Sequence, residues 1–260
     1  MEYTNLLTEY NDGILVVTIN RPKALNALNK QTLSDLRQLF EKDALSLNDL
    51  RGVVLTGAGG KAFVAGADIT EFNGLDAQGG LHMAQNGHDI FFTIERFHVP
   101  VVAAVGGYAL GGGCELSMAC HIRVASEKAV FGQPEVNLGL IPGYGGTQRL
   151  IQYIGKARAL ELLMTADMID AKKALDWGLA THVVPHGEEV AKATEILRKI
   201  AKKAPIAIAK TIAAVNAYFD NEVDGFNQEV LLFAQTVKTE DFKEGATAFI
   251  EKRKADFKGK

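Results

Sequence analysis

Residues 107–116 read Gly-Tyr-Ala-Leu-Gly-Gly-Gly-Cys-Glu-Leu. The three consecutive glycines, 111–113, lack a Cβ, so the backbone there can approach a ligand closely and adopt conformations closed to other residues. The small, helix-compatible residues that follow, 114–120, predict a helix whose N-terminus presents free N–H groups and favours negative charge. A carbonyl oxygen that becomes an oxyanion would be stabilised there. The alternative is a glycine run that serves only close packing of a strand against a helix.

Two glutamates carry the chemistry of this region. Glu115 ends the glycine run, and Glu135 ends Phe-Gly-Gln-Pro-Glu, residues 131–135, too far along the chain to share one helix face. If the fold brings them together, a water molecule can be held between two carboxyl groups, of which one accepts a proton and the other gives one. This is the chemistry of hydration.

The surroundings of the two glutamates differ, which suggests separate roles. Pro134 fixes its own φ and pushes Gln133 toward an extended conformation, so Glu135 is presented from a stiff turn. Glu115 lies in the first turn of the predicted helix, where the dipole favours the ionised form. We therefore expect Glu115 to act as the base and Glu135, kept protonated by burial beside a like charge, as the acid. The reverse assignment stays open.

Three further segments complete a set of motifs. Residues 61–69 read Lys-Ala-Phe-Val-Ala-Gly-Ala-Asp-Ile and follow a strand-like run at 52–56, residues 20–28 read Asn-Arg-Pro-Lys-Ala-Leu-Asn-Ala-Leu, and residues 141–150 read Ile-Pro-Gly-Tyr-Gly-Gly-Thr-Gln-Arg-Leu. In this order the five motifs closely resemble the enoyl-CoA hydratase (crotonase) family. The resemblance extends from about residue 14 to residue 254.

The resemblance implies a role for each matching position. The backbone N–H groups of Ala67 and Gly112 would form an oxyanion hole for a thioester carbonyl, Glu115 and Glu135 would flank the water, and Gly143 would lie near that water. CoA contacts are implied for Lys23, Ala24, Leu25, Ala67, Asp68, Ile69, Thr70, Phe249 and Lys252, the last two toward the CoA of a neighbouring subunit.

Two positions depart from the family pattern. The chain has Gly106-Gly107 where the family often has Asn-Gly, and His121 where it has Asp. Neither is a catalytic position, so we expect the departures to affect local packing.

The order of elements predicts an α/β fold. Strand-like runs at 14–19, 52–56, 100–105, 121–125 and 180–184 alternate with helical patterns, as in domains with crossover connections. From residue 187 onward only helical spacing is found. We therefore expect an α/β core over residues 1–186 and a helical C-terminal subdomain over residues 187–260. The resemblance implies a superhelix of strand-strand-helix repeats, and a homotrimer or homohexamer (a dimer of trimers) assembled through the C-terminal helices.

Composition excludes several classes of protein. The 260 residues are 47% hydrophobic and 23% charged, with a net charge of −3, which is typical of a globular protein without general affinity for nucleic acids or anionic membranes. The acidic N-terminal residues and the lack of a long apolar run predict a cytoplasmic protein. Cys114 and Cys120 are expected to be buried thiols.

Two local patterns imitate other sites. Residues 57–62 fit the Gly-x-Gly-x-x-Ala pattern of dinucleotide binding, but the residues after them interrupt the long helix that such a site needs. His182 and His186 have a spacing found in metal sites, yet Pro185 breaks any helix that would align them. We expect no metal, and no cofactor besides the CoA of the substrate.

The leading hypothesis is a hydro-lyase of fatty acid metabolism that adds water reversibly to trans-2-enoyl-CoA to give 3-hydroxyacyl-CoA. Glutamate at both positions resembles the hydratases, whereas the alternative, a double-bond isomerase, needs only one. RNA binding is a remote third hypothesis, disfavoured by the acidic charge. Because residues 71–97 carry only moderately bulky side chains beyond Phe91 and Phe92, we expect short acyl chains such as crotonyl-CoA.

Overall fold

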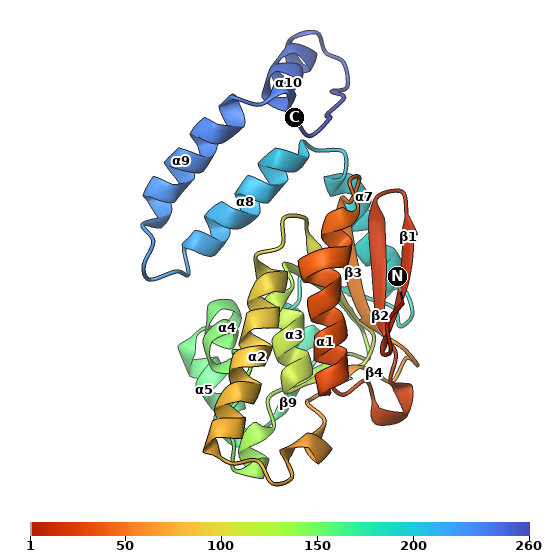
Figure 1. Cartoon of the computed structure of the whole chain (residues 1–260), viewed down its shortest axis with the longest axis vertical. Helices are drawn as coiled ribbons and strands as arrows, with labels where there is room; N and C mark the ends of the chain where they lie inside the picture. The colour runs from red at the N-terminus through yellow and green to blue at the C-terminus, as the bar shows by residue number, and fades with distance from the viewer. Residues whose placement is uncertain (1) are drawn as a thin grey trace.

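A computed structural model describes residues 2–260 of the chain. Two sheets form its centre (Figure 1). The six-stranded sheet has the order β1 (Leu6–Asn11), β2 (Ile14–Ile19), β3 (Gly52–Gly57), β5 (Val101–Val105), β7 (Ile122–Ser126) and β10 (His182–Val184). The four-stranded sheet has the order β4 (Ala62–Ala65), β6 (Tyr108–Leu110), β8 (Val130–Gly132) and β9 (Met168–Asp170). The pairs β1–β2 and β8–β9 are antiparallel, and the other neighbours are parallel.

Successive strands alternate between the two sheets. β3, β5 and β7 each enter the larger sheet, and the strand that follows each of them, β4, β6 or β8, enters the smaller one before the chain forms a helix. The result is the strand-strand-helix repeat expected from the sequence. The run Val-Val-Ala-Ala-Val of β5 is buried along its whole length, as continuous apolar strands of a parallel sheet covered on both faces are.

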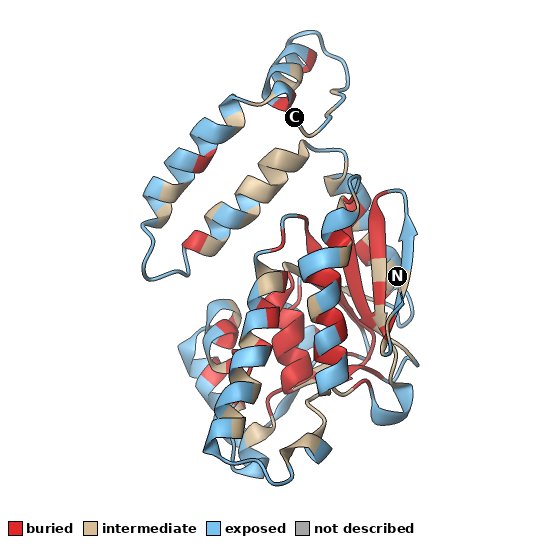
Figure 2. Ribbon diagram, viewed as in Figure 1, coloured by how far each residue is buried: buried red, intermediate tan, exposed pale blue. Residues whose placement is uncertain are grey.

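Helices cover both faces of the larger sheet. α1 (Lys30–Gln38), α2 (Ala77–Glu95) and α3 (Gly112–Ala119) lie side by side on one face (Figure 1). α3 is buried throughout (Figure 2). α7 (Glu189–Ile200) packs on the opposite face, where its Ala193 and Leu197 contact Val54, Val102 and Val124. α6 (Ala171–Trp177) packs on β8 and β9 of the smaller sheet, and α4 (Gly146–Ile154) packs between α3 and α5 (Lys156–Thr165).

Short helical turns and caps connect these elements. The side chains of Asn29 and Asp76 accept hydrogen bonds from N–H groups in the first turns of α1 and α2, which stabilises the helix starts. The 3-10 turns are Pro22–Ala24, Ala44–Ser46, Ile69–Phe72 and Glu135–Leu138, and a π-helical turn spans Leu39–Asp43.

The last three helices form an arm that projects from the core. α8 (Pro205–Ala217) packs against α9 (Gly225–Val237), and α10 (Glu240–Ile250) lies at the far end (Figure 1). Within residues 187–260, therefore, α7 belongs to the layer that covers the sheet, and the separate arm begins at Pro205. Among residues 2–260, no helix is both long enough and apolar enough to cross a bilayer.

Candidate active site

Two backbone N–H groups meet beside the glycine run. Leu28 donates its N–H to the carbonyl of Gly66 at 2.9 Å and accepts from the N–H of Asp68 at 2.7 Å. In this parallel bridge the N–H of Ala67, the residue between them, faces away from Leu28. A Cβ placed on Gly112 would lie 3.5 Å from Ala67 N, and neither N–H has an acceptor within residues 2–260. Two donors therefore converge on one point, as in an oxyanion hole.

The three glycines serve both purposes considered from the sequence. Gly111 is the N-cap of α3 with φ +48°, a conformation that favours glycine. A Cβ on Gly113 would lie 1.9 Å from the carbonyl oxygen of Val64 in β4. Gly113 is thus required for close packing of α3 on β4, and that packing brings Gly112 to Ala67.

Glu115 is buried and held by backbone donors of another segment. It is only 1% exposed, and its Oε1 accepts hydrogen bonds from the N–H of Tyr144 at 2.8 Å and of Gly146 at 2.7 Å. Sequence reasoning missed these two donors. For Gly146 the signal was present in Pro-Gly-Tyr-Gly-Gly, because Gly145, with φ +105°, is the N-cap of α4 and the first N–H groups of a helix lack partners within it.

The protonation of Glu115 differs from the expectation that the helix dipole keeps it ionised. Burial, with a smaller contribution from the charge of Glu135, raises the pKa of Glu115 to about 7, although the N–H groups of Gly146 and Tyr144 oppose the shift. α3 has only eight residues, and its dipole does not offset the loss of water around the carboxylate.

Glu135 lies beside the N-terminus of α3, the helix that carries Glu115. Burial raises the pKa of Glu135 above its ordinary value, and a Cβ on Gly111 would be 2.7 Å from Glu135 Oε1. Its carboxylate therefore sits over the cap of the helix whose first turn carries Glu115. The buried amide of Gln133, with its NH₂ turned toward Glu135, donates to both carboxylate oxygens at 3.1 Å.

Residues 9–260 match the family model described as enoyl-CoA hydratase/isomerase. The chain belongs to the enoyl-CoA hydratase/isomerase family. It is 45% identical to the short-chain-enoyl-CoA hydratase of Clostridium acetobutylicum over 98% of both chains, and 44% identical to the crotonyl-CoA hydratase of Syntrophomonas wolfei over 99% of both. The crystal structure of enoyl-CoA hydratase from Bacillus anthracis superposes with a TM-score of 0.92 at 37% identity, covering 99% of this chain and 100% of that one. These similarities confirm the resemblance indicated by the five motifs and the fold class derived from it.

The two departures from the family pattern are accommodated by packing. A Cβ on Gly106 would lie 2.7 Å from Glu189 Oε1, so in this chain a carboxylate occupies the space that an asparagine would need. His121 joins two elements, because its Nδ1 accepts from the N–H of Val101 at 2.8 Å and its Nε2 lies 3.0 Å from the carbonyl oxygen of Glu95.

The remaining sequence-predicted residues lie in three kinds of surroundings. Lys23, Ala24 and Leu25 are exposed. They lie beside the site because the carbonyl of Leu25 accepts a backbone hydrogen bond from Ala65 of β4. Ile69 and Thr70 are also exposed, and Gly143 has no atom within 4 Å of a Cβ position.

Asp68, by contrast, is paired with Arg21. Phe249 and Lys252 lie at the far end of the arm, and Phe249 is 86% exposed.

Proposed function

We propose that the protein is an enoyl-CoA hydratase, which adds water reversibly to trans-2-enoyl-CoA thioesters to give 3-hydroxyacyl-CoA in fatty acid metabolism. The observation that carries the proposal is the convergence of the buried Glu115 and the half-buried Glu135, both with raised pKa values, on two N–H groups that have no acceptor within residues 2–260. Full-length relatives that are named short-chain-enoyl-CoA hydratase and crotonyl-CoA hydratase support it.

The two N–H groups act on the thioester. Ala67 and Gly112 donate to the carbonyl oxygen, which becomes negatively charged as water adds to C3. Loss of one such donor typically costs about 2.7–4 kcal/mol of transition-state stabilisation. Because both donors belong to the backbone, their directions are set by the fold around Gly66 and Gly111.

The two carboxyl groups move the protons. Glu115, whose Oε1 is held by Tyr144 and Gly146, takes a proton from water through its other oxygen while the water oxygen bonds to C3. Glu135 gives a proton to C2, so that the double bond is lost and one water is added in balance. In the reverse direction the roles are exchanged. A pKa of Glu115 of about 7 suits a group that must both accept and release a proton near neutral pH.

A short acyl chain is supported by the packing behind Tyr144. A Cβ on Gly87 of α2 would lie 2.1 Å from the Tyr144 ring, and Phe91 packs edge-to-face on that ring with centroids 5.5 Å apart. The other edge of the ring lies 3.4 Å from a Cβ position on Gly112. Tyr144 thus fills the space between α2 and the proposed oxyanion hole. We expect kcat/KM to fall from crotonyl-CoA to hexenoyl-CoA to decenoyl-CoA, and the reverse order would contradict this preference.

The deciding experiment replaces each glutamate with glutamine. Glu115→Gln and Glu135→Gln keep the side-chain shape but remove proton transfer, and each is expected to lower the rate of crotonyl-CoA hydration about 10²–10⁴-fold without loss of CoA binding. If Glu115→Gln hydrates normally, or if the wild type isomerises 3-enoyl-CoA far faster than it hydrates 2-enoyl-CoA, the protein is an isomerase.

We also propose that the arm mediates assembly into a homotrimer or a dimer of trimers. It exposes large apolar side chains that a monomer would leave in water: Tyr218, Phe226, Val230, Phe233, Phe249 and Ile250. Apolar patches of this kind mark interaction surfaces. In such an assembly Phe249 and Lys252 would reach the CoA of a neighbouring subunit.

A further inference from the structure

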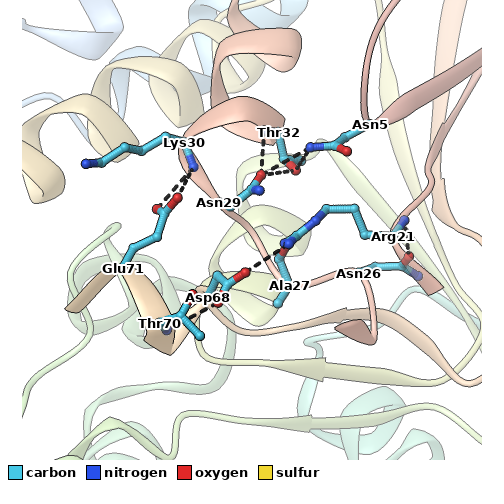
Figure 3. A network of polar contacts seen from close by, with 10 residues as sticks. All are labelled: Asn5, Arg21, Asn26, Ala27, Asn29, Lys30, Thr32, Asp68, Thr70 and Glu71. Atoms are coloured by element: carbon cyan, nitrogen blue, oxygen red, sulfur yellow. Dashed lines mark hydrogen bonds and ion pairs between the residues drawn. The ribbon is translucent and has the colours of Figure 1, made fainter. Parts of the chain in front are cut away.

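Arg21 connects the segment before α1 with the segment after β4 (Figure 3). Its Nη2 pairs with Asp68 Oδ2 at 2.9 Å, and its Nη1 donates to the carbonyl oxygen of Ala27. The Arg21 and Asp68 side chains are only 19% and 16% exposed. One guanidinium group therefore joins the two segments that form the Leu28–Ala67 bridge.

Both oxygens of the Asp68 carboxylate accept hydrogen bonds within the protein. Its Oδ1 accepts from Thr70 N at 3.2 Å and from Thr70 Oγ1 at 2.7 Å, and its Oδ2 binds Arg21. These hydrogen bonds, first to Thr70 and then to Arg21, lower the pKa of Asp68 below its ordinary value. The side chain is thus an internal anchor between Thr70 and Arg21.

Ala67 needs such an anchor because the residue before it is a glycine. Gly66 has φ +99° and no Cβ to restrict its backbone, so the direction of the Ala67 N–H depends on what holds Asp68 and Leu28. On the Leu28 side, Asn26 is completely buried, and its amide donates to the carbonyls of Ala58 and Ala62, both at 2.9 Å. Arg21 connects this rigid segment to Asp68.

Charge provides a second reason for the pair. Asp68 is the neighbour of a residue whose N–H would stabilise a developing negative charge. An uncompensated carboxylate there would oppose that charge, and the guanidinium group of Arg21 neutralises it.

We propose that Arg21 and Asp68 are positioning residues for the oxyanion hole, and that their ion pair fixes the direction of the Ala67 N–H. The inference rests on the proposed function of Ala67. It assigns to Asp68 a role different from the CoA contact implied by the family resemblance. Misplacement of a catalytic group by about 1 Å costs up to about 100-fold in rate, so a weakened pair should lower kcat more than it weakens binding.

The experiment compares Arg21→Gln, Arg21→Lys, Asp68→Asn and the double variant Arg21→Gln/Asp68→Asn. Lys172→Gln, which removes the exposed Lys172–Asp176 pair on α6, is the matched control. We would measure kcat and KM for crotonyl-CoA, the Kd of CoA, and the infrared stretching frequency of the ¹³C-labelled thioester carbonyl in bound crotonyl-CoA. That frequency reports polarisation of the carbonyl by its hydrogen-bond donors.

We expect Arg21→Gln to lower kcat about 10–100-fold and to leave the Kd of CoA unchanged. The shift of the carbonyl stretching frequency on binding should be smaller than in the wild type. Arg21→Lys should recover part of kcat and part of that frequency shift. The double variant should be more active than Arg21→Gln alone, because it carries no uncompensated carboxylate, and Lys172→Gln should match the wild type.

Two outcomes would overturn the inference. Arg21→Gln and Asp68→Asn could keep the wild-type kcat and carbonyl frequency, or they could weaken CoA binding while kcat and carbonyl frequency stay unchanged, as a direct CoA contact would. Measurement of the carbonyl frequency requires that crotonyl-CoA binds but not that it is hydrated. A wild type that binds crotonyl-CoA without hydrating it would therefore refute the hydratase function, while the same spectra would still decide the role of the pair.

Discussion

The Oε1 atom of Glu115 accepts a hydrogen bond from the backbone N–H of Tyr144 at 2.8 Å, across 29 residues of sequence. The proposed base is thus held by the turn before α4. That turn is itself anchored, because Arg149 Nη1 donates to the Tyr144 carbonyl at 3.0 Å and Arg149 Nη2 pairs with Glu95 of α2 at 2.8 Å. The position of the Glu115 carboxyl therefore depends on the packing of α2, α3 and α4 together.

Burial of Glu115 predicts a specific dependence of stability on pH. Its pKa is about 7 in the folded protein against an ordinary value near 4.5, so the folded state binds the proton more tightly than the unfolded state. The contribution of this group is fully present below pH 4.5 and is lost as the pH rises through 7. The difference corresponds to about 3 kcal/mol. Glu115→Gln, which can still accept both hydrogen bonds, should therefore gain stability relative to the wild type between pH 4.5 and 8 in urea titrations. A difference independent of pH would contradict the raised pKa.

The oxyanion hole can be tested by removing one donor. Gly112 is the first residue of α3, a position that accommodates proline well, and Gly112→Pro removes its N–H. We expect kcat on crotonyl-CoA to fall by a factor equivalent to about 2.7–4 kcal/mol. Gly112→Ala keeps the N–H, and its Cβ would meet the nearest atoms at 3.4–3.5 Å, so it should lose far less. A folded Gly112→Pro protein with wild-type kcat would rule out this donor.

His121 should make the fold sensitive to acid. Burial lowers the pKa of His121, with Arg123 adding to the shift and Glu95 opposing it, so the neutral ring is favoured in the folded state. Its stability contribution is present above the unfolded pKa of about 6.5 and is lost as the pH falls toward the folded pKa, by no more than about 1.4 kcal/mol per pH unit. Between pH 7.5 and 5.5 the Tm of the wild type should fall more than that of His121→Asn. Parallel Tm curves would show that His121 does not titrate on unfolding.

Phe249 and Lys252 test whether the arm completes the CoA site. Because Phe249 is 86% exposed, Phe249→Ala should not destabilise a monomer. If a neighbouring subunit presents its CoA to these residues, Phe249→Ala and Lys252→Gln should each raise the Kd of CoA about tenfold, or about 1.4 kcal/mol. Calorimetry would give the Kd and light scattering the assembly state. Leu7→Ala, at an exposed apolar position on β1, is the control, and equal Kd values for all variants would place CoA recognition elsewhere.

The sequence alone was enough to recognise the family and the α/β class and to predict the glutamate pair. These three features depend on local sequence patterns. Glycines at 111–113, the small residues before Ala67 and the Pro-Glu turn each encode a backbone shape within a few residues, and their order along the chain identifies the arrangement.

Only the tertiary structure decided the properties that arise from packing. Burial of Glu115 outweighs the helix dipole and raises its pKa, because desolvation depends on everything that surrounds the carboxyl group. Its donors at Tyr144 and Gly146, and the pairing of Arg21 with Asp68, join segments 29–47 residues apart. α7 reads like the other C-terminal helices, yet it covers the sheet because its small buried face fits β3, β5 and β7. Periodicity shows that a helix has an apolar face, and the three-dimensional fold determines which surface that face covers.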